Sequence, residues 1–464
     1  MMKYIIILLL LSILAASTTA FTPPAARLST ATTTITTQPQ RHRHFSTYQF
    51  DRDYISDETT LINIDEEAPR DIPSMEQWSY EMGAQRTDGF TLTSDDGGYN
   101  VYAMTTTDLP TGSPILTIPE HMILSSNKAM AELRSSDMSE AEKIIKSVNA
   151  ESEFRQYYLM LKLLVEYEKG ESSPWYQWLN SLPRYYTNAA SMTPFCCLCL
   201  PSLMRKLTVQ ERGYLQRLGV SSIKLVPYLN EDTKYDVDLC TWVYQIVYTR
   251  SFESPDGDLK IVPLADMFNH GAYPEVEASY DEAGNYYAYT TYDVPAGTPL
   301  RMSYGDPTNP SFLFARYGFL DESTEATFCK IIPEHISKEM EELGYAHNRM
   351  LFYKDGTVSE EVWDILLLQH VSSTKIGDKR ALMEAHRNGD YATKQMLHEK
   401  YYQFTSAALL EHIEGFLGQL DKLSTKAEDR QRDLGDHPRL PLILAHNEFV
   451  KQIFMTVRMQ NFGY

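Results

Sequence analysis

The chain has 464 residues, of which 43% are hydrophobic, and a formal net charge of -20 at pH 7. This length and apolar content are enough for two or three domains with hydrophobic cores, and they exclude a disordered or fibrous protein. The acidic balance disfavours binding to nucleic acid, because phosphate backbones attract basic surfaces. A basic peptide would instead be attracted to such a surface.

The first twenty residues have the pattern of a signal peptide. Lys3 precedes an apolar run from Ile5 to Ala16, and small residues follow that allow cleavage before Phe21. The apolar run is shorter than the ~20 residues that a membrane-spanning helix needs. We therefore predict a signal peptide at residues 1–20 and expect no stable membrane anchor after its cleavage.

Residues 21–50 have the composition of a transit peptide, rich in Ser, Thr and Pro, with three arginines and no acidic residue. The aromatic Phe21 at the junction resembles the bipartite presequences of algae with secondary plastids. A signal peptide followed by a transit peptide predicts import into a complex plastid, with the secretory pathway as the alternative. The acidic segment at residues 51–74 is expected to be a solvated linker.

After this linker the sequence alternates short apolar runs with turns, which predicts small twisted β-units between Met75 and Ser125. The expected strands lie at Phe90–Leu92, Val101–Ala103 and Pro114–Ile118.

From about 127 to 252 the hydrophobic period becomes helical, which predicts a helical insertion. Tyr157, Leu161 and Tyr167 fall on one face of such a helix. Aromatic residues at helical spacing belong more often to a core than to a ligand site, so we interpret Tyr157, Tyr158 and Tyr167 as packing residues.

Strand patterns return after the insertion, at Glu275–Tyr280, Tyr286–Tyr292 and Pro299–Tyr304. The first two are expected to form a hairpin across the turn Asp281–Gly284. The prediction is a mixed β-core over residues 75–325 that is divided by the helical insertion.

Beyond Phe319 the pattern is nearly all helical, with long amphipathic stretches at Thr393–Leu423 and Leu440–Met459. We expect a separate all-α domain at residues 326–464. The fold class is therefore predicted as α+β, with a β-fold followed by a helical domain.

The five cysteines are odd in number and mostly bunched, so no disulfide framework can be derived from them. They are Cys196, Cys197, Cys199, Cys240 and Cys329. Cys196 and Cys199 have the C-x-x-C spacing, but no second ligand pair follows at a zinc-site distance. We expect a reducing compartment and no metal site.

Three short motifs follow one another in the second half of the β-region. They are Val262–His270, which ends in Asp-Met-Phe-Asn-His, then Ser303–Gly305 with the nearby Asn309, and finally Tyr317–Phe319. In this order and spacing they resemble the SET-domain family of plant Rubisco large-subunit lysine methyltransferases.

Further matches lie outside these motifs. Trp175 with Leu182–Pro183, and Thr249–Phe252, are similar to family segments that precede the second half of the SET fold. The helical tail resembles the family's substrate-binding domain by architecture more than by motif.

The resemblance implies a pseudoknot that brings the chain around Ser303 to the Asn269–His270 loop. It also implies S-adenosylmethionine as the cofactor and a lysine-bearing segment of a protein as the substrate. The implied cofactor-binding residues are Asn269, His270, Thr249, Asn100, Val101 and Tyr317. The implied catalytic residues, which face the transferring methyl group, are Tyr317 and Tyr304.

Two neighbours of the motifs have less specific interpretations. Asp266 is expected to give structural support. Arg250 either pairs with an acidic residue beneath the cofactor pocket or anchors its own helix, and the sequence favours neither.

Two departures from the family pattern bear on activity. Asn100 stands where the family has the last glycine of Gly-x-Gly-Arg-Gly-Leu, and Gly271 stands where serine is frequent. Asparagine tolerates positive φ, so the turn can survive, but a side chain now stands where backbone should approach the cofactor. The alternative function is a catalytically impaired SET scaffold that serves as a protein-binding module.

Overall fold

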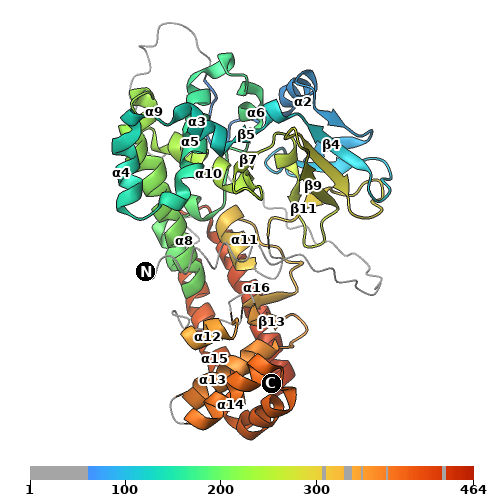
Figure 1. Cartoon of the computed structure of the whole chain (residues 1–464), viewed down its shortest axis with the longest axis vertical. Helices are drawn as coiled ribbons and strands as arrows, with labels where there is room; N and C mark the ends of the chain where they lie inside the picture. The colour runs from blue at the N-terminus through green and yellow to red at the C-terminus, as the bar shows by residue number, and fades with distance from the viewer. Residues whose placement is uncertain are drawn as a thin grey trace. The chain divides into compact units, whose positions relative to one another are not determined.

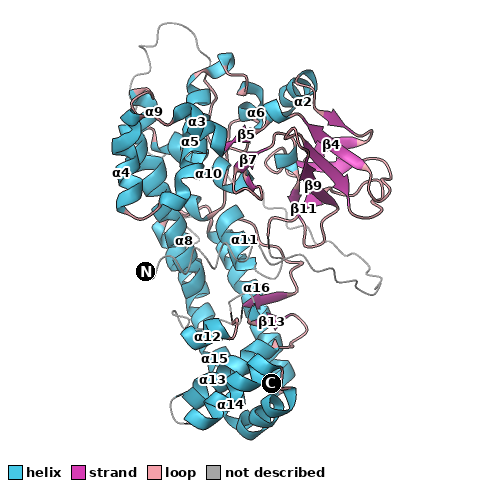
Figure 2. Ribbon diagram, in the orientation of Figure 1, coloured by secondary structure: helices cyan, strands magenta, loops and turns pink. Residues whose placement is uncertain are grey.

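The computed structural model describes residues 61–463 apart from 306–309, 329–336, 346–348, 373–374 and 431–434. The predicted signal peptide and transit segment, and the residues Asn309 and Cys329, lie outside the described part. Before Phe319, the strands gather on one side and most helices on another, as Figure 2 shows. The fold class is mixed helix and strand, as predicted.

The largest sheet has four antiparallel strands in the order β1-β4-β10-β9. Their bounds are β1 Gln85–Arg86, β4 Pro114–Ile118, β9 Val276–Tyr280 and β10 Tyr286–Thr290. The hairpin predicted across Asp281–Gly284 is confirmed, because Tyr286 pairs with Tyr280. Ile115 and Leu116 of β4 are buried, as expected for a central strand between β1 and β10.

Two smaller sheets flank this one. Strands β2 (Phe90–Thr93) and β3 (Tyr102–Thr105) form an antiparallel pair. The three-stranded sheet β5-β7-β6 joins the start of the insertion to its end, because β5 lies before it and β6 and β7 follow it. The bounds are β5 Leu124–Ser125, β6 Phe252–Glu253 and β7 Leu259–Ile261.

The predicted strand at Pro299–Tyr304 is shorter than expected. Only β11 (Arg301–Met302) is a strand, and it pairs in parallel with β8 (Asn269–His270). The Gly271 N–H also donates to the Met302 carbonyl at 3.0 Å. This pairing confirms that the chain before Ser303 lies beside the Asn269–His270 loop.

The helical insertion is present between β5 and β6. Its helices are α3 Ser126–Leu133, α4 Ser139–Ser147, α5 Phe154–Glu168, α6 Tyr176–Ser181, α7 Pro194–Leu198, α8 Ser202–Tyr214, α9 Glu231–Tyr235 and α10 Val237–Arg250. Tyr157 and Tyr158 of α5 are fully buried and Tyr167 nearly so, which confirms their interpretation as packing residues. This core continues into the β-region through residues such as Phe268.

The region after Phe319 is mainly helical. Its helices are α12 Lys338–Glu342, α13 Glu360–Ser372, α14 Ile376–Asn388, α15 Tyr391–Glu428 and α16 Leu440–Phe462, and α11 Pro310–Tyr317 precedes them. The strands β12 (Ala326–Phe328) and β13 (Leu351–Tyr353) form a two-stranded antiparallel sheet that the all-α prediction did not include. Figure 1 shows α13, α14 and α15 close together, and their apolar faces form a core of their own.

A buried carboxylate joins two of these helices, α13 and α15, and the segment after α12. Asp364 of α13 accepts hydrogen bonds from the Tyr345 hydroxyl (2.7 Å) and His398 Nε2 (2.8 Å), and it forms an ion pair with Lys394 (2.7 Å). Burial alone would raise the pKa of Asp364, but the bonds from His398, Lys394 and Tyr345 outweigh it and lower the pKa. We call these four residues the Asp364 cluster.

A third apolar cluster joins the insertion to α11 and α16. It includes Met192, Cys196, Cys199, Met204, Phe314, Leu440 and Ile443. Cys196, Cys197, Cys199 and Cys240 are buried free thiols, and burial raises the pKa of Cys199 to about 11. The C-x-x-C spacing therefore belongs to packing residues.

The described part of the predicted linker, residues 61–74, is for the most part exposed or half-buried but is attached at specific points. Ile62 is buried, and its carbonyl accepts from the Tyr167 hydroxyl. Helix α2 (Ile72–Glu81) begins inside this segment, capped by Asp71. The acidic composition of the segment gave no sign of these contacts.

Within residues 61–463, where described, no helix is both long and apolar enough to cross a membrane.

Candidate functional site

The parallel pairing of β8 and β11 assembles the first part of the site. It places Asn269 opposite Arg301 and His270 opposite Met302. From the other side, the Asn269 side-chain amide donates to Asn100 Oδ1 at 3.2 Å. Three segments that are far apart in the sequence therefore meet at Asn269.

His270 connects the first motif to the second. Its Nδ1 accepts a hydrogen bond from the Tyr304 backbone N–H at 3.0 Å, so Nδ1 carries no proton in this arrangement. Its Nε2 lies 3.8 Å from the Asp321 carboxylate. Burial lowers the pKa of His270, with Asp321 opposing and Arg301 adding to the effect, which favours the neutral ring. In the described structure its side chain acts as an acceptor that holds Tyr304.

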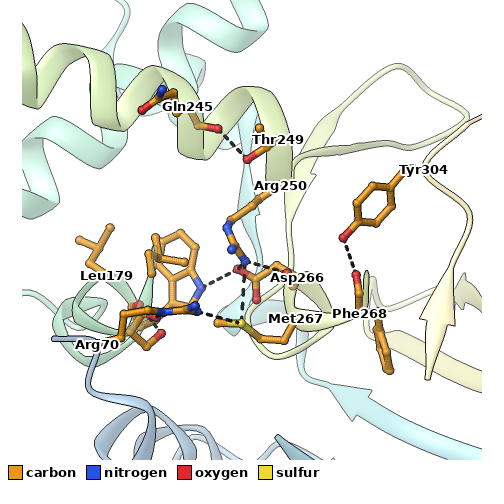
Figure 3. Close-up of polar contacts among 12 residues, drawn as sticks. Arg70, Leu179, Gln245, Thr249, Arg250, Asp266, Met267, Phe268 and Tyr304 are labelled. Carbon is orange, nitrogen blue, oxygen red and sulfur yellow. Dashed lines mark hydrogen bonds and ion pairs between the residues drawn. The ribbon is translucent and has the colours of Figure 1, made fainter. Parts of the chain in front are cut away.

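The two predicted catalytic tyrosines, Tyr304 and Tyr317, form an aromatic group with Phe319. The ring centroids of Tyr304 and Tyr317 are 4.6 Å apart, and those of Tyr317 and Phe319 are 6.1 Å apart. The Tyr304 hydroxyl donates to the Phe268 carbonyl at 2.5 Å, as Figure 3 shows, whereas the Tyr317 hydroxyl has a long contact of 3.5 Å to the Tyr304 carbonyl. Burial raises the pKa of Tyr304, so its hydroxyl stays protonated at neutral pH.

Gly318 explains why the last motif needs a glycine. Its φ is +77°, and an added Cβ would lie 2.3 Å from the Asn188 backbone nitrogen and 2.4 Å from the Thr187 carbonyl carbon. The Thr187 hydroxyl also donates to the Gly318 carbonyl at 2.6 Å. Any side chain here would push Tyr317 and Phe319 away from the helical insertion.

Arg250 and Asp266 form a buried ion pair beneath the loop of the first motif. Arg250 Nη1 lies 3.0 Å from Asp266 Oδ2 and donates to the Asp266 carbonyl at 2.7 Å. The Trp178 indole also donates to Asp266 Oδ2, at 3.2 Å. Asp266 thus gives the structural support that was expected, and of the two interpretations of Arg250 the acidic pair is the correct one.

Sequence reasoning missed Arg70, which reaches this cluster from the segment expected to be a linker. Its guanidinium donates to the Ser181 carbonyl at 2.7 Å and to the Tyr99 carbonyl at 3.0 Å, and it contacts Met267 Sδ at 3.6 Å. Burial, followed by the neighbouring Arg250, lowers the pKa of Arg70 to about 9. A lone arginine in an acidic stretch carries no sequence signal, so only the structure could locate it.

Tyr186 is a second residue that the sequence did not indicate. It is 8% exposed, and burial raises its pKa while Arg250, Arg70 and Arg184 oppose the shift. Arg250 contacts its hydroxyl, but no described acceptor takes the hydroxyl proton, and Arg250 Nε and Asp266 Oδ1 are likewise buried without partners in the described part of the chain. Buried polar atoms without partners need an explanation, and a bound water or ligand is one.

Two of the predicted cofactor residues, Thr249 and Val101, lie apart from the hydrogen bonds that join Asn269, His270 and Tyr304. The Thr249 hydroxyl donates to the Gln245 carbonyl within α10 at 2.7 Å, and Figure 3 shows it directed away from Arg250 and Asp266. Val101 has a buried side chain, so only its backbone can face a ligand. Neither forms a hydrogen bond to Asn269 or His270 in the described part of the chain, and their assignment stays a prediction.

The Asn100 loop is ordered by its own side chains. The Asp96 carboxylate accepts from the Asn100 N–H at 2.8 Å, and Ser94 Oγ accepts from the Gly98 N–H at 2.8 Å. Gly97 and Gly98 take positive φ angles of 80° and 99°, whereas Asn100 does not. The expectation that Asn100 would need to tolerate positive φ is therefore wrong, because the two preceding glycines make the turn.

Gly271, the other departure from the family pattern, is matched to its neighbour. An added Cβ would lie 3.0 Å from Arg301 Cβ and 3.2 Å from Arg301 Nε. Arg301 in turn forms an ion pair with the buried Glu275 at 2.6 Å. The glycine makes room for this arginine, so the departure does not loosen the loop.

In the described ranges, no group of three or more His, Cys, Asp or Glu side chains is arranged to hold a metal ion.

This arrangement of sheets and helical insertion is similar to that of solved structures that contain a SET domain. No protein-family model matches the chain. Among curated proteins, SET domain-containing protein 4 of Homo sapiens is 23% identical over 235 residues, which cover 47% of this chain and 51% of that protein. The match therefore spans about half the length of this relative.

Solved structures of Rubisco LSMT are similar to the chain. The structure of Rubisco LSMT bound to AdoMet has a TM-score of 0.56 and 17% identity, over 85% of this chain and 92% of that one. The SET domain of LSMT bound to lysine and AdoHcy has a TM-score of 0.55 and 15% identity, over 84% and 90%. At these identities the likeness shows the fold.

Proposed function

We propose that this protein is an S-adenosylmethionine-dependent protein N-methyltransferase that acts on lysine side chains of a plastid protein. The observation that carries the proposal is the joining of Asn269, His270, Tyr304 and Tyr317 by the β8–β11 pairing. These are the residues that the family resemblance assigns to the cofactor and the methyl group. The AdoMet and lysine named for the Rubisco LSMT structures support the same chemistry.

The charged and polar side chains around Asp266 suit the amino-acid part of S-adenosylmethionine, which carries a carboxylate. Arg70, Arg184 and Arg250 act electrostatically on the same buried space, in which Asp266 is the carboxylate that offsets them. This excess of positive charge favours an anionic group such as a carboxylate. Arg250 Nε and the Tyr186 hydroxyl have donor capacity that no described residue uses. The Asn269 amide would hold the same end of the molecule.

The aromatic group provides the path for the substrate amine. When bound, S-adenosylmethionine supplies a methyl group on a positively charged sulfur. Tyr304 is fixed by its bond to the Phe268 carbonyl and cannot act as a base, because burial keeps its hydroxyl protonated. Tyr317 has the weaker contact, so its hydroxyl oxygen is the group that we assign to aligning the lysine nitrogen. Aligned in-line geometry can supply ~7–11 kcal/mol of the barrier.

The lysine must lose a proton before it can attack, since its free pKa is ~10.4. The rings of Tyr304, Tyr317 and Phe319 exclude water from the amine, and a desolvated amine next to a positive charge has a lowered pKa. The chain therefore needs no dedicated general base. Aromatic faces also attract the cationic methylammonium product.

Titration calorimetry with S-adenosylmethionine tests the cofactor assignment. We expect saturable binding by the wild type and none by Asn269→Ala, whose melting temperature should stay near that of the wild type because Asn269 is partly exposed. A folded wild-type protein that binds no cofactor would refute the enzyme proposal.

A second variant tests the methyl-facing role. Tyr317→Phe removes one hydroxyl, and we expect it to lower methyl transfer to a plastid extract with little change in cofactor affinity. Phe312→Leu, an aromatic substitution in the same helix α11, is the control for nonspecific effects on packing. A Tyr317→Phe variant with the wild-type rate would remove Tyr317 from the mechanism.

The second candidate function is a SET scaffold that binds protein without turnover. The observation that favours it is the hydrogen bond from the Asn269 amide to Asn100, which occupies the very group that would hold the cofactor. The calorimetry above separates the two candidates.

The plastid assignment is supported by the composition of residues 1–50. Fusion of these residues to a fluorescent reporter should label the plastid. Label in the endoplasmic reticulum or the medium would instead support the secretory alternative. Mass spectrometry of plastid proteins from a knockout would identify the methylated substrate.

A further inference from the structure

The segment Pro183–Asn188, which follows α6 in the helical insertion, contacts each part of the site in turn. The Tyr185 ring lies 6.5 Å from that of Tyr99, edge to face, beside the Asn100 loop. Thr187 donates to the Gly318 carbonyl, and Asn188 accepts from the Gln245 amide of α10 at 3.2 Å. We call residues 183–188 the bridging segment.

Tyr186 is the residue of this segment whose hydroxyl proton has no described acceptor, because Arg250, the side chain in contact with its oxygen, can only donate. Its phenol is more than nine-tenths buried, and its hydroxyl lies where Arg250, Arg70 and Arg184 act on it electrostatically. A buried donor without an acceptor is unfavourable, and Arg250 Nε is buried without a partner as well. Asp266 Oδ1 is an unpaired acceptor of the same cluster, and an acceptor on a ligand would satisfy the donor that remains.

Arg439, directly before α16, fixes the backbone of Tyr186. Its Nε and Nη2 donate to the Tyr186 carbonyl at 3.0 and 2.7 Å, and its guanidinium lies 4.4 Å from the centre of the Tyr185 ring. It is 5% exposed, and its outer side forms an ion pair with Glu66 at 2.6 Å. A residue of the C-terminal region therefore holds one wall of the site, 253 positions away in sequence.

We propose that Tyr186 is a further cofactor-binding residue, whose hydroxyl donates to the carboxylate end of the cofactor beside Arg250, and that Arg439 is the positioning residue that holds Tyr186 there. This inference rests on the proposed function. It assigns to the C-terminal region a part in forming the cofactor site as well as any part in docking the substrate.

Two probes separate this role from a general loss of structure. S-adenosylhomocysteine has the carboxylate, whereas methylthioadenosine keeps the nucleoside and sulfur but lacks the amino-acid end. We expect Tyr186→Phe to raise the Kd of S-adenosylhomocysteine about tenfold and to leave that of methylthioadenosine within twofold. Equal weakening of both probes, or no weakening of either, would overturn the role of Tyr186.

The role of Arg439 is tested in the full chain with a matched control. Arg439→Gln should weaken S-adenosylhomocysteine about as much as Tyr186→Phe does, whereas Glu66→Gln, which removes only the outer ion pair, should change the Kd less than twofold. Arg439→Lys keeps the charge but not the two parallel bonds, and it should fall between them. If Glu66→Gln weakens binding as much as Arg439→Gln, the bonds to Tyr186 are not the cause.

A double-mutant cycle connects the two residues. If Arg439 acts through Tyr186, adding Arg439→Gln to Tyr186→Phe should weaken binding less than twofold further. Independent, multiplying effects would overturn the positioning role. A wild-type protein that binds neither probe would refute the proposed function itself, whereas wild-type binding with unaffected variants would refute only this inference.

Discussion

Two buried polar clusters of this molecule differ in how completely their atoms are paired. In the Asp364 cluster, one carboxylate oxygen accepts from His398 and the other from Tyr345 and Lys394. In the site, Asp266 Oδ1, Arg250 Nε and the Tyr186 hydroxyl are buried without partners among the described residues.

The difference in pairing indicates that the Asp364 cluster stabilises the fold and that the polar residues of the site bind a ligand. A satisfied buried network contributes to folding, while an unsatisfied one costs stability and is retained where a ligand completes it. We therefore expect substitutions in the Asp364 cluster to change the free energy of unfolding and those in the site to change ligand affinity.

Asp364→Asn should have the largest effect on stability. It leaves Lys394 and His398 without their buried partner, and we expect a loss of about 3 kcal/mol in the free energy of unfolding, measured by chemical denaturation. The control is Asp378→Asn, which removes a more exposed ion pair with Lys400 and should cost less than about 1 kcal/mol. A change in cofactor affinity in Asp364→Asn would contradict the contrast.

The same cluster predicts a pH dependence. Because the folded-state pKa of Asp364 is lowered, its contribution is full above the unfolded value of ~3.9 and is lost as pH falls through the folded value. The acid limb of a stability profile should therefore be less steep in Asp364→Asn than in the wild type. Identical slopes below about pH 4 would show that Asp364 is not the titrating group.

Arg250→Lys tests the other side of the contrast. Lysine keeps the positive charge near Asp266 but has neither the fork geometry nor the Nε donor. We expect the Kd of S-adenosylmethionine to rise about thirtyfold, equivalent to about 2 kcal/mol, with a smaller change in unfolding free energy. Arg458→Lys on α16, where the arginine pairs with Glu414, is the control. A loss of stability without a loss of affinity would place Arg250 with the structural residues.

Asn100→Gly should tighten cofactor binding. The Asn269 amide donates to Asn100 in the described structure, and removal of this side chain frees the amide without straining the turn. The expected gain is severalfold in Kd, or about 1 kcal/mol, measured by calorimetry. Weaker binding in the variant would mean that the Asn100 side chain itself contacts the ligand.

Gly271→Ser should have the smallest effect, about 1 kcal/mol of stability, because the new Cβ would press on Arg301. The penalty should shrink in an Arg301→Ala background, which removes the crowding Nε and Cδ atoms and keeps only Cβ. Thermal unfolding of the four proteins of this cycle measures it. An unchanged penalty would show that the family serine is excluded for another reason.

Much of this fold follows from local patterns. Strand β4 has the predicted bounds, the hairpin β9–β10 has the predicted turn, and the long helices α15 and α16 lie where their apolar periods placed them. Asn269, His270, Tyr304 and Tyr317 were also chosen correctly as residues that come together, because each belongs to a motif with its own spacing.

The remaining site residues could not be predicted, for a physical reason. Arg70, Tyr186 and Arg439 reach the site through tertiary contacts from segments whose local composition is unremarkable for a loop. The role of Gly271 depends on the side chain of Arg301, thirty residues later, and no periodicity relates the two. Such pairs require the three-dimensional arrangement.

The parallel pairing of β8 and β11 also bears on the order of folding. Parallel strands cannot be joined by a tight turn, and the chain between β8 and β11 contains the hairpin β9–β10. Closing this loop lowers the entropy of the chain. The hydrogen bonds between the two-residue strands form only after the loop is closed. During synthesis, the Asn269–His270 loop therefore stays unsupported until Met302 has left the ribosome, and we expect it to be among the last parts of the β-region to become protected from hydrogen exchange.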